Sequence, residues 1–484
     1  MKKSIMKNYL YNLAYQILII IMPIITTPYL ARTLGASGIG TYSYTISIVT
    51  YFILLGSLGT AVYGQREIAY VQDDTKKRSI VFYEILMLRC ITMPIAMIIF
   101  YFMYCKTGEY SVYFKILLLE ILANCFDISW FFQGIENFKK TAIRNIIIKI
   151  ISVISIFLFI KNENDTGKYL VIYTLTNLFG NVSLWIGLKK YITKVKFKEI
   201  RFAKQLKPAI TFFIPQIAIQ IYTVLDKTMI GAITNNMSEV GYYEQTQKIV
   251  KMLLTLITSL GTVMVPRISK CYIDGNISQI RKYMNKTFRF VYMLAFPLIF
   301  GIIATADNFV PLFLGEGYAE VKILMKIMSW IILFIGLGNI LGSQYLLSTK
   351  QQKKFTICVV CGAIVNAILN VLMIPKLQSL GAVIATVAAE FSVTAMELYF
   401  VKEEFNIKEI FSLSKKYIVS AVIMFVVIQI PKAIIHSEIT TVIVQVILGA
   451  ILYFSILLIL KDDMILELKD KFLNKRVKEN IGEE

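Results

Sequence analysis

The sequence predicts an all-α protein that crosses a membrane about 14 times, as two pseudo-symmetric six-helix lobes followed by two C-terminal helices. Three observations support this prediction: the composition, the spacing of the apolar runs and the charges of their connections. Of the 484 residues, 57% are hydrophobic and only 17% are charged, and the mean hydropathy is +0.65. A water-soluble chain of this length would need far more polar surface. The apolar runs are continuous rather than alternating, which excludes a β-barrel.

Apolar runs of roughly 20 residues recur along the chain, each long enough to cross a hydrocarbon core of about 30 Å. The predicted spans are 8–33, 38–63, 81–104, 112–133, 141–160, 169–189, 208–233, 240–265, 286–306, 321–347, 355–375, 380–401, 415–435 and 438–460. Alternate connections such as DDTKKRS and KQQKK are basic, whereas GASG, TNNMSEV and TADNFVPLFLGEGYAE contain no Lys or Arg. The positive-inside rule therefore predicts a multi-pass protein of the cell (plasma or inner) membrane with both termini cytoplasmic. The same pattern explains the formal net charge of +20 without a nucleic-acid partner.

Two segments of the chain resemble each other. GIGTYSYTISIVTYFILLGSLGT, which ends at Thr60, matches EVGYYEQTQKIVKMLLTLITSLGT, which ends at Thr262, in its Gly–x–Tyr start and its final SLGT. Spans 1 and 7 also carry two prolines each, and bent helices at corresponding places in two halves are typical of secondary transporters. We therefore predict a first lobe at 1–190, a basic cytoplasmic linker at 191–206, a second lobe at 207–402, and a C-terminal helix pair with a basic tail at 403–484.

Polar side chains recur at helical spacing on several predicted spans. The stripe on span 7 contains Gln216, Gln220, Thr223 and Lys227, and the stripe on span 8 contains Glu244, Lys248, Lys251, Thr255, Thr258 and Thr262. Stripes of hydroxyl groups alone are common at helix–helix contacts. Two lysines on one face cannot both be matched by Glu244, so we predict a water-filled cavity between the halves.

Charged side chains inside a membrane are costly and usually functional. Arg32 and Arg66 could extend to lipid headgroups at helix ends, whereas Arg89 lies about 12 Å inside span 3 at 1.5 Å per residue and could pair with Glu84. A basic cavity suits an anionic cargo such as a phosphate or pyrophosphate, which Arg and Lys bind strongly. The predicted substrate-binding residues are Arg32, Arg66, Arg89, Lys227, Lys248, Lys251, Gln216 and Gln220.

Several segments resemble a known family over essentially the whole chain. The resemblance is carried by NYLYNLAYQILIIIMPIITTPYLARTLGASGIGTYSY, YGQREIA, WFFQGIENFKKTAIRN, LDKTMIG, EVGYYEQTQKIV, PRIS and GAVIATVAAE. These segments are similar to bacterial lipid-linked oligosaccharide flippases, the polysaccharide transport branch of the multidrug/oligosaccharidyl-lipid/polysaccharide exporter superfamily. The resemblance implies movement of an undecaprenyl-pyrophosphate-linked repeat unit from the inner to the outer leaflet. Ion-coupled alternating access, as in an antiporter, would drive this step of capsule or surface polysaccharide synthesis.

The same resemblance implies roles for particular basic residues. In the related lipid II flippases, cavity arginines hold the pyrophosphate, and Arg32 in LARTLG lies where such a residue is expected. Lys248 and Lys251 occupy the equivalent part of span 8, as lysines where the relatives have arginine. The implied partners are the lipid-linked glycan and membrane lipids, with a polysaccharide polymerase and glycosyltransferases in the same pathway.

The relatives also bind a sodium ion in the second lobe. Asp226 of span 7, Asn366 and Asn370 of span 11, and Thr386 of span 12 correspond to that site. Carboxylate, amide and hydroxyl oxygens suit a small hard cation, and a proton on Asp226 would serve the same purpose. These residues could alternatively form an interhelical hydrogen-bond network. We expect no cofactor beyond a coupling Na⁺ or H⁺.

Other functions of the same fold stay open at this point. A lipid II flippase is not excluded by the sequence, whereas a multidrug cation exporter would need about twelve spans and an acidic cavity. A membrane polysaccharide polymerase is less consistent with the chain, because it would need large external loops with catalytic groups. The sole histidine, His436, lies at a predicted helix end. We therefore predict a transporter without a catalytic site, not an enzyme.

Overall fold

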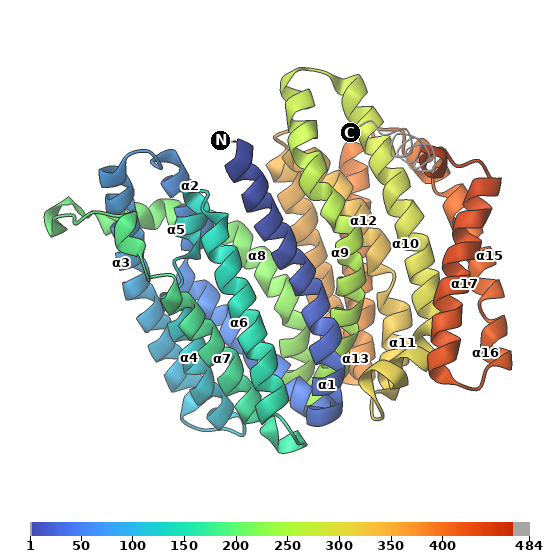
Figure 1. Cartoon of the computed structure of the whole chain (residues 1–484), viewed down its shortest axis with the longest axis horizontal. Coiled ribbons are helices and arrows are strands. Elements are labelled where there is room, and N and C mark those ends of the chain that lie inside the picture. The colour runs from blue at the N-terminus through green and yellow to red at the C-terminus, as the bar shows by residue number, and fades with distance from the viewer. Residues whose placement is uncertain (1, 468–484) are drawn as a thin grey trace. The chain divides into compact units, whose positions relative to one another are not determined.

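The computed structural model describes residues 2–467, with side chains from residue 21 onward except at positions 138, 212, 214–216, 218, 219, 221, 222, 262 and 263. Helices make up the regular structure (Figure 1), and no strand occurs among these described residues. Ten helical segments in this range are long and apolar enough to cross a membrane. The chain divides into two units, residues 1–241 and 242–484. These findings confirm the predicted all-α membrane fold.

Eight α-helices form the first unit together with short π and 3₁₀ turns. They are α1 (Lys2–Ser57), α2 (Thr60–Tyr70), α3 (Thr75–Phe100), α4 (Ser111–Cys125), α5 (Ser129–Gly134), α6 (Phe138–Phe159), α7 (Thr166–Ser183) and α8 (Phe202–Thr234), with η1 (Tyr101–Cys105), η2 (Glu163–Asp165), η3 (Leu188–Lys190) and η4 (Phe197–Glu199) between them. Helix α7 packs on α4 and α6, as Figure 1 also shows. An aromatic core that includes Phe82, Trp130 and Phe131 fills the space between α3 and α5.

The second unit begins within α9 (Met237–Ile273). Its other elements are α10 (Ile277–Leu314), α11 (Ala319–Met328), α12 (Ile331–Gly338), η5 (Asn339–Leu347), α13 (Gln352–Val401), α14 (Ile407–Ser412), α15 (Lys415–Val427), α16 (Ile430–Ile434) and α17 (Glu438–Ile459). Helix α10 contacts α11, α12, α15 and α17, and α13 packs against α11, α12 and η5. The last two predicted spans thus pack on α10 within the second unit (Figure 1).

Two continuous helices each contain a sharp break where the sequence predicts a connection between spans. Gly35 in α1 has φ 66° and ψ 176°, a backbone conformation that glycine adopts readily. In α13 the break is at Gln378, with φ 52° and ψ −128°. The ten apolar segments join the predicted spans on either side of each break and do not include α4 or α8. The count of about 14 spans therefore stays a prediction.

The basic segment 191–206 is bound to α3 of the first unit. Arg78 donates hydrogen bonds to the carbonyl of Tyr191, and the hydroxyl of Ser79 accepts the backbone N–H of Thr193 at 2.8 Å. Helix α8 contacts α1, α2 and α3. These contacts describe how the segment packs within the first unit. They do not test the predicted division into two lobes, a linker at 191–206 and a C-terminal helix pair, which stays a prediction.

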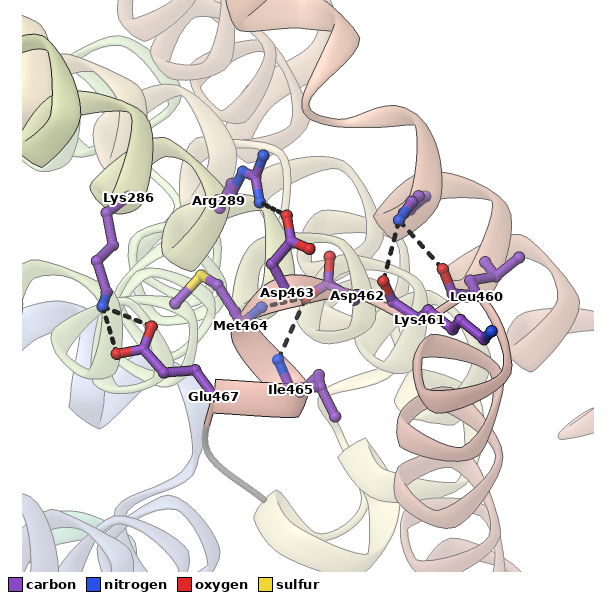
Figure 2. Close-up of polar contacts among 10 residues, drawn as sticks. Lys286, Arg289, Leu460, Lys461, Asp462, Asp463, Met464, Ile465 and Glu467 are labelled. Carbon is purple, nitrogen blue, oxygen red and sulfur yellow. Dashed lines mark hydrogen bonds and ion pairs between the residues drawn. The ribbon is translucent and has the colours of Figure 1, made fainter. Parts of the chain in front are cut away.

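Ionic contacts attach the segment after α17 to α10 (Figure 2). Lys286 donates to both carboxylate oxygens of Glu467 at 2.7 and 2.8 Å, and Arg289 pairs with Asp463. The Arg289 hydrogen bond holds the pKa of Asp463 below its usual value. Asp462 accepts the backbone N–H of Met464 at 3.1 Å, as a helix-capping carboxylate does. These contacts place a cluster of charge at one end of α10.

Candidate substrate and ion sites

Arg89 of α3 lies deep inside the first unit. Its side chain is 2% exposed, and its two terminal nitrogens donate to the carbonyls of Asp127 and Asn124, each at 2.7 Å. These carbonyls lie at the C-terminal end of α4, where the backbone leaves acceptors unmatched and a cation is favoured. In this structure Arg89 stabilises a helix end, and its predicted role in substrate binding stays a prediction.

Glu84, which the sequence suggested as a partner for Arg89, bonds elsewhere. Its carboxylate accepts the backbone N–H of Arg201 at 2.8 Å and the side-chain amide of Gln205, and Tyr63 donates its hydroxyl to the same glutamine. The predicted pairing is wrong, because residues five apart on a helix point about 140° away from each other. Glu84 instead stabilises the N-terminal end of α8, where an anion is favoured.

The other two arginines that were predicted to bind substrate, Arg32 and Arg66, lie nearer the surface of the first unit. Arg32 on α1 is exposed. Arg66 on α2 pairs with Glu67 at 2.9 Å, and its guanidinium lies 5.7 Å from the ring centroids of both Tyr63 and Tyr70. Cation–π contacts with two aromatic rings hold this guanidinium in position.

Helix α8 carries the adjacent Asp226 and Lys227 in different environments. Asp226 is 2% exposed, whereas Lys227 is half-buried. Thr228 follows directly, and its hydroxyl lies 2.8 Å from Ser47 and 3.2 Å from Tyr51, which attaches α8 to α1. The two neighbours therefore do not share one face, as the helical period requires.

The remaining polar residues of α8 are only partly described. Gln220 is exposed and accepts the hydroxyl of Thr223 at 3.0 Å. The side chain of Gln216 lies outside the described residues. On α9, Lys248 and Lys251 are both half-buried in the second unit. The predicted contacts of these residues with a substrate stay predictions.

Three of the four predicted ion ligands lie inside the second unit on α13. Asn366 and Asn370 are 0% exposed, and Asn370 donates its amide to the Asn366 side-chain oxygen at 3.0 Å. The Thr386 hydroxyl lies 3.0 Å from that of Tyr243, which also accepts the amide of Gln247 at 3.2 Å. Asp226 belongs to the first unit, so a four-residue ion site stays a prediction.

Sequence reasoning missed Tyr243 and Gln247, although both belong to the quoted segment EVGYYEQTQKIV. They lie four residues apart, so they share a helix face. Their spacing predicts the contact between the two side chains, whereas no local signal indicates the contact of Tyr243 with Thr386. Among the described residues, no group of three or more His, Cys, Asp or Glu side chains could hold a metal ion.

A second missed feature is a network of amide side chains in the first unit. Asn177 on α7 donates to both oxygens of Glu120 on α4, at 3.1 and 3.2 Å. One helical turn away, Asn181 donates to the carbonyl of Ala123 at 2.8 Å and accepts from Arg144 on α6 at 2.8 Å. The network satisfies a buried carboxylate with neutral donors and joins three helices.

Comparison with known proteins identifies the family. Residues 5–272, more than half of the chain, match the polysaccharide biosynthesis protein family. The chain belongs to this family. Residues 212–372 also match the MatE family.

Relatives of this polysaccharide biosynthesis protein cover most of its length. A protein of Escherichia coli (strain K12) named as a candidate O-antigen transporter is 24% identical over 83% of this chain and 97% of its own. The capsular polysaccharide biosynthesis protein CapF of Staphylococcus aureus is 22% identical over 82% of this chain and 100% of its own. The solved structure of a lipid II flippase MurJ, inward closed, has a TM-score of 0.74 at 18% identity over 94% of this chain and 100% of its own.

The family assignment confirms the resemblance predicted from the sequence. The chain is an integral membrane protein of this family, and its relatives are named as transporters and flippases rather than enzymes. Its relatives are named for O-antigen and for capsular polysaccharide. At 18% sequence identity, the similarity to the solved MurJ structure supports the fold and nothing further.

Arg89→Ala tests whether the buried guanidinium serves folding or cargo. Loss of two charge-assisted hydrogen bonds should lower the free energy of unfolding by about 3 kcal/mol or more, and thermal unfolding of the purified protein in detergent would measure it. Arg89→Lys keeps one cation and should recover part of the loss. A fully stable Arg89→Ala protein that no longer exports glycan would instead assign Arg89 to the substrate.

Proposed function

We propose that the chain moves an undecaprenyl-pyrophosphate-linked oligosaccharide repeat unit from the inner to the outer leaflet by ion-coupled alternating access. The product would serve capsule or another surface polysaccharide. Glycosyltransferases would supply the repeat unit on the cytoplasmic side, and a polymerase would consume it on the outer side.

The observation that carries this proposal is the similarity, over more than four fifths of the chain, to relatives named for O-antigen and capsule. The charges are consistent with an anionic cargo. Arg66 is positioned by two aromatic rings, and Lys227, Lys248 and Lys251 are half-buried cations of predicted spans. Such cations bind phosphate oxygens strongly and would hold the pyrophosphate.

Flipping by the purified protein in vesicles tests the cargo. Vesicles that contain the chain and a fluorescent undecaprenyl-pyrophosphate oligosaccharide should expose the glycan to an external glycosidase faster than empty vesicles do. In cells, loss of the chain should leave repeat units on the inner leaflet and deprive the polymerase of substrate. Equal rates with and without protein would contradict the proposal.

A lipid II flippase is the second candidate, because the structure is similar to that of MurJ with a TM-score of 0.74. The same vesicles with lipid II in place of the oligosaccharide lipid separate the two. We expect faster movement of the oligosaccharide lipid. Faster movement of lipid II would favour the second candidate.

We further propose that the protein lies in the cell membrane with both termini cytoplasmic, as the positive-inside rule indicates. The segment around Leu377, beside the break at Gln378 in α13, would then be external. A reporter fused after Leu377 should give an external signal, and one fused after Lys350 should give a cytoplasmic signal. Reversed signals would contradict this topology.

A further inference from the structure

A buried glutamate lies against a π-helical segment of the second unit. The segment is η5 (Asn339–Leu347), which continues α12 and packs against α13. π-helical turns are rare and are often found at functional sites. Glu397 of α13 contacts this region from the opposite helix. Glu397 is not among the ion ligands predicted from the sequence, which are Asp226, Asn366, Asn370 and Thr386.

The Glu397 carboxyl is almost completely buried and has no charge partner among the residues that the structure describes. The residue is 1% exposed, and its Oε2 atom has no hydrogen-bond partner among the described residues. Asp307, Asp463 and Glu467, by contrast, form ion pairs with lysine or arginine in the described part of the second unit. An ionised carboxylate without a cation or donor is very costly in an apolar interior, and such a group takes up a proton instead.

Two glycines make the space that the carboxyl occupies. A Cβ atom on Gly338 would lie 3.2 Å from Oε2 of Glu397, and one on Gly342 would collide with Oε1. Gly338 ends α12 and Gly342 lies within η5. The carboxyl therefore lies directly against the backbone of the segment, and a change in the helical pitch of η5 would change its surroundings.

Among the described residues, the charged groups that act on Glu397 include no cation. Glu390, two turns earlier on α13, and Cys358, on the first half of α13, lie close enough to interact with it. The segment 331–347, which contains α12 and η5, has Tyr345 as its one titratable residue, and Tyr345 donates to Glu404. On α11, which also packs against α13, Lys326 pairs with Asp307 at 2.6 Å. Helix α9, whose Gly261 lies against Asn339 and Gln344 of η5, carries Lys248 and Lys251 earlier along its length.

We propose that Glu397 is a proton-binding site of the second unit, protonated in this state, and that rearrangement of η5 releases the proton. A role of Glu397 in coupling rests on the proposed ion-coupled transport. In that case a proton gradient would drive the change between the inward-facing and outward-facing states. The proton moves between the carboxyl oxygen and water, with no other bond made or broken.

Infrared difference spectroscopy of the full purified chain in lipid tests the site without any cargo. The wild-type protein should show a protonated-carboxyl band in acid buffer that disappears in alkaline buffer. Glu397→Gln should lack this band at every pH. Glu390→Gln, a half-buried control on the same helix, should show the same band and the same loss as the wild type. Identical wild-type and Glu397→Gln spectra would overturn the proposal. So would loss of the band on addition of Na⁺ at constant pH, which would indicate a sodium site.

Glycine variants keep the test decisive even if Glu397→Gln does not fold. Gly342→Ala, which crowds the carboxyl, should shift the pH midpoint of the band. Gly301→Ala on α10, where a Cβ would meet nothing within 4 Å, should leave it unchanged. If the pH midpoint of the band were the same in Gly342→Ala and Gly301→Ala, the carboxyl that gives the band would not lie against η5.

Transport measurements then test the coupling role. In vesicles, Glu397→Gln should flip glycan at a rate that no longer responds to an imposed pH gradient. An unchanged response would remove Glu397 from coupling. If the wild-type chain flips no glycan, the proposed function fails, whereas the infrared result still decides whether Glu397 binds a proton.

Discussion

Replacement of both Lys248 and Lys251 by Ala should abolish glycan export. Each lysine that binds a pyrophosphate oxygen contributes about 1.5–3 kcal/mol, so loss of both should reduce affinity for the lipid head by roughly a hundredfold or more. Complementation of a flippase-null strain, with surface polysaccharide measured on intact cells, would show the loss. Both side chains are half-buried on α9, so the protein should still reach the membrane.

Two matched variants separate anion binding from other effects. Lys248→Arg with Lys251→Arg keeps both charges and should retain export. Lys270→Ala removes an exposed lysine from the same helix and should have no effect. Full complementation by the double alanine variant would exclude these lysines from the cargo site, and equal loss in all three variants would indicate damage to α9.

The positions of the helices could be predicted from the sequence because the membrane leaves the backbone few alternatives. Inside hydrocarbon each peptide group must be paired within its own segment, so continuous apolar runs become helices. Every predicted span falls mainly on helix in the structure, including those on either side of the breaks at Gly35 and Gln378. Several spans are divided by a turn, among them 112–133 between α4 and α5 and 415–435 between α15 and α16. The π-helical turn η5 could not be predicted, because its residues are compatible with an ordinary helix.

Polar contacts were predictable only where they depend on local spacing. The Asn366–Asn370 hydrogen bond follows from positions four apart on a helix. The contact of Thr386 with Tyr243 joins residues separated by 143 positions, which no periodicity reveals. The alternative interpretation of the ion site as a hydrogen-bond network is therefore consistent with these contacts, and a bound cation needs a direct test.

Arg89 shows why a buried charge alone does not identify a binding site. Its hydrogen bonds reach carbonyls 35 and 38 residues away, at the end of α4. The cost of burying the guanidinium is offset within the fold, so no ligand is needed to explain it. The Glu397 carboxyl differs, because no described donor offsets the cost of its ionised form.

Asp226→Asn should uncouple transport from an ion gradient. The amide has the shape of the carboxylate but lacks its charge, so it should hold Na⁺ much more weakly. It also cannot take up and release a proton as a carboxylate does. Because Asp226 is 2% exposed, a cation there would be largely shielded from water and held strongly by one carboxylate. Flipping in vesicles with imposed Na⁺ or pH gradients would show a rate in the variant that no longer depends on either gradient.

A stability measurement identifies which ion Asp226 binds, independently of cargo. If the ion is sodium, NaCl at one hundred times its dissociation constant should stabilise the wild-type protein by about 2.7 kcal/mol relative to KCl, and Asp226→Asn should lose this difference. Asp73→Asn, at an exposed position before α3, should keep it. If the ion is a proton, Na⁺ should have no specific effect on stability. The response of transport to a pH gradient should then disappear in Asp226→Asn or in the double variant with Glu397→Gln. Gradient-dependent flipping that survives in both single variants and in the double variant would place the coupling ion at neither carboxyl.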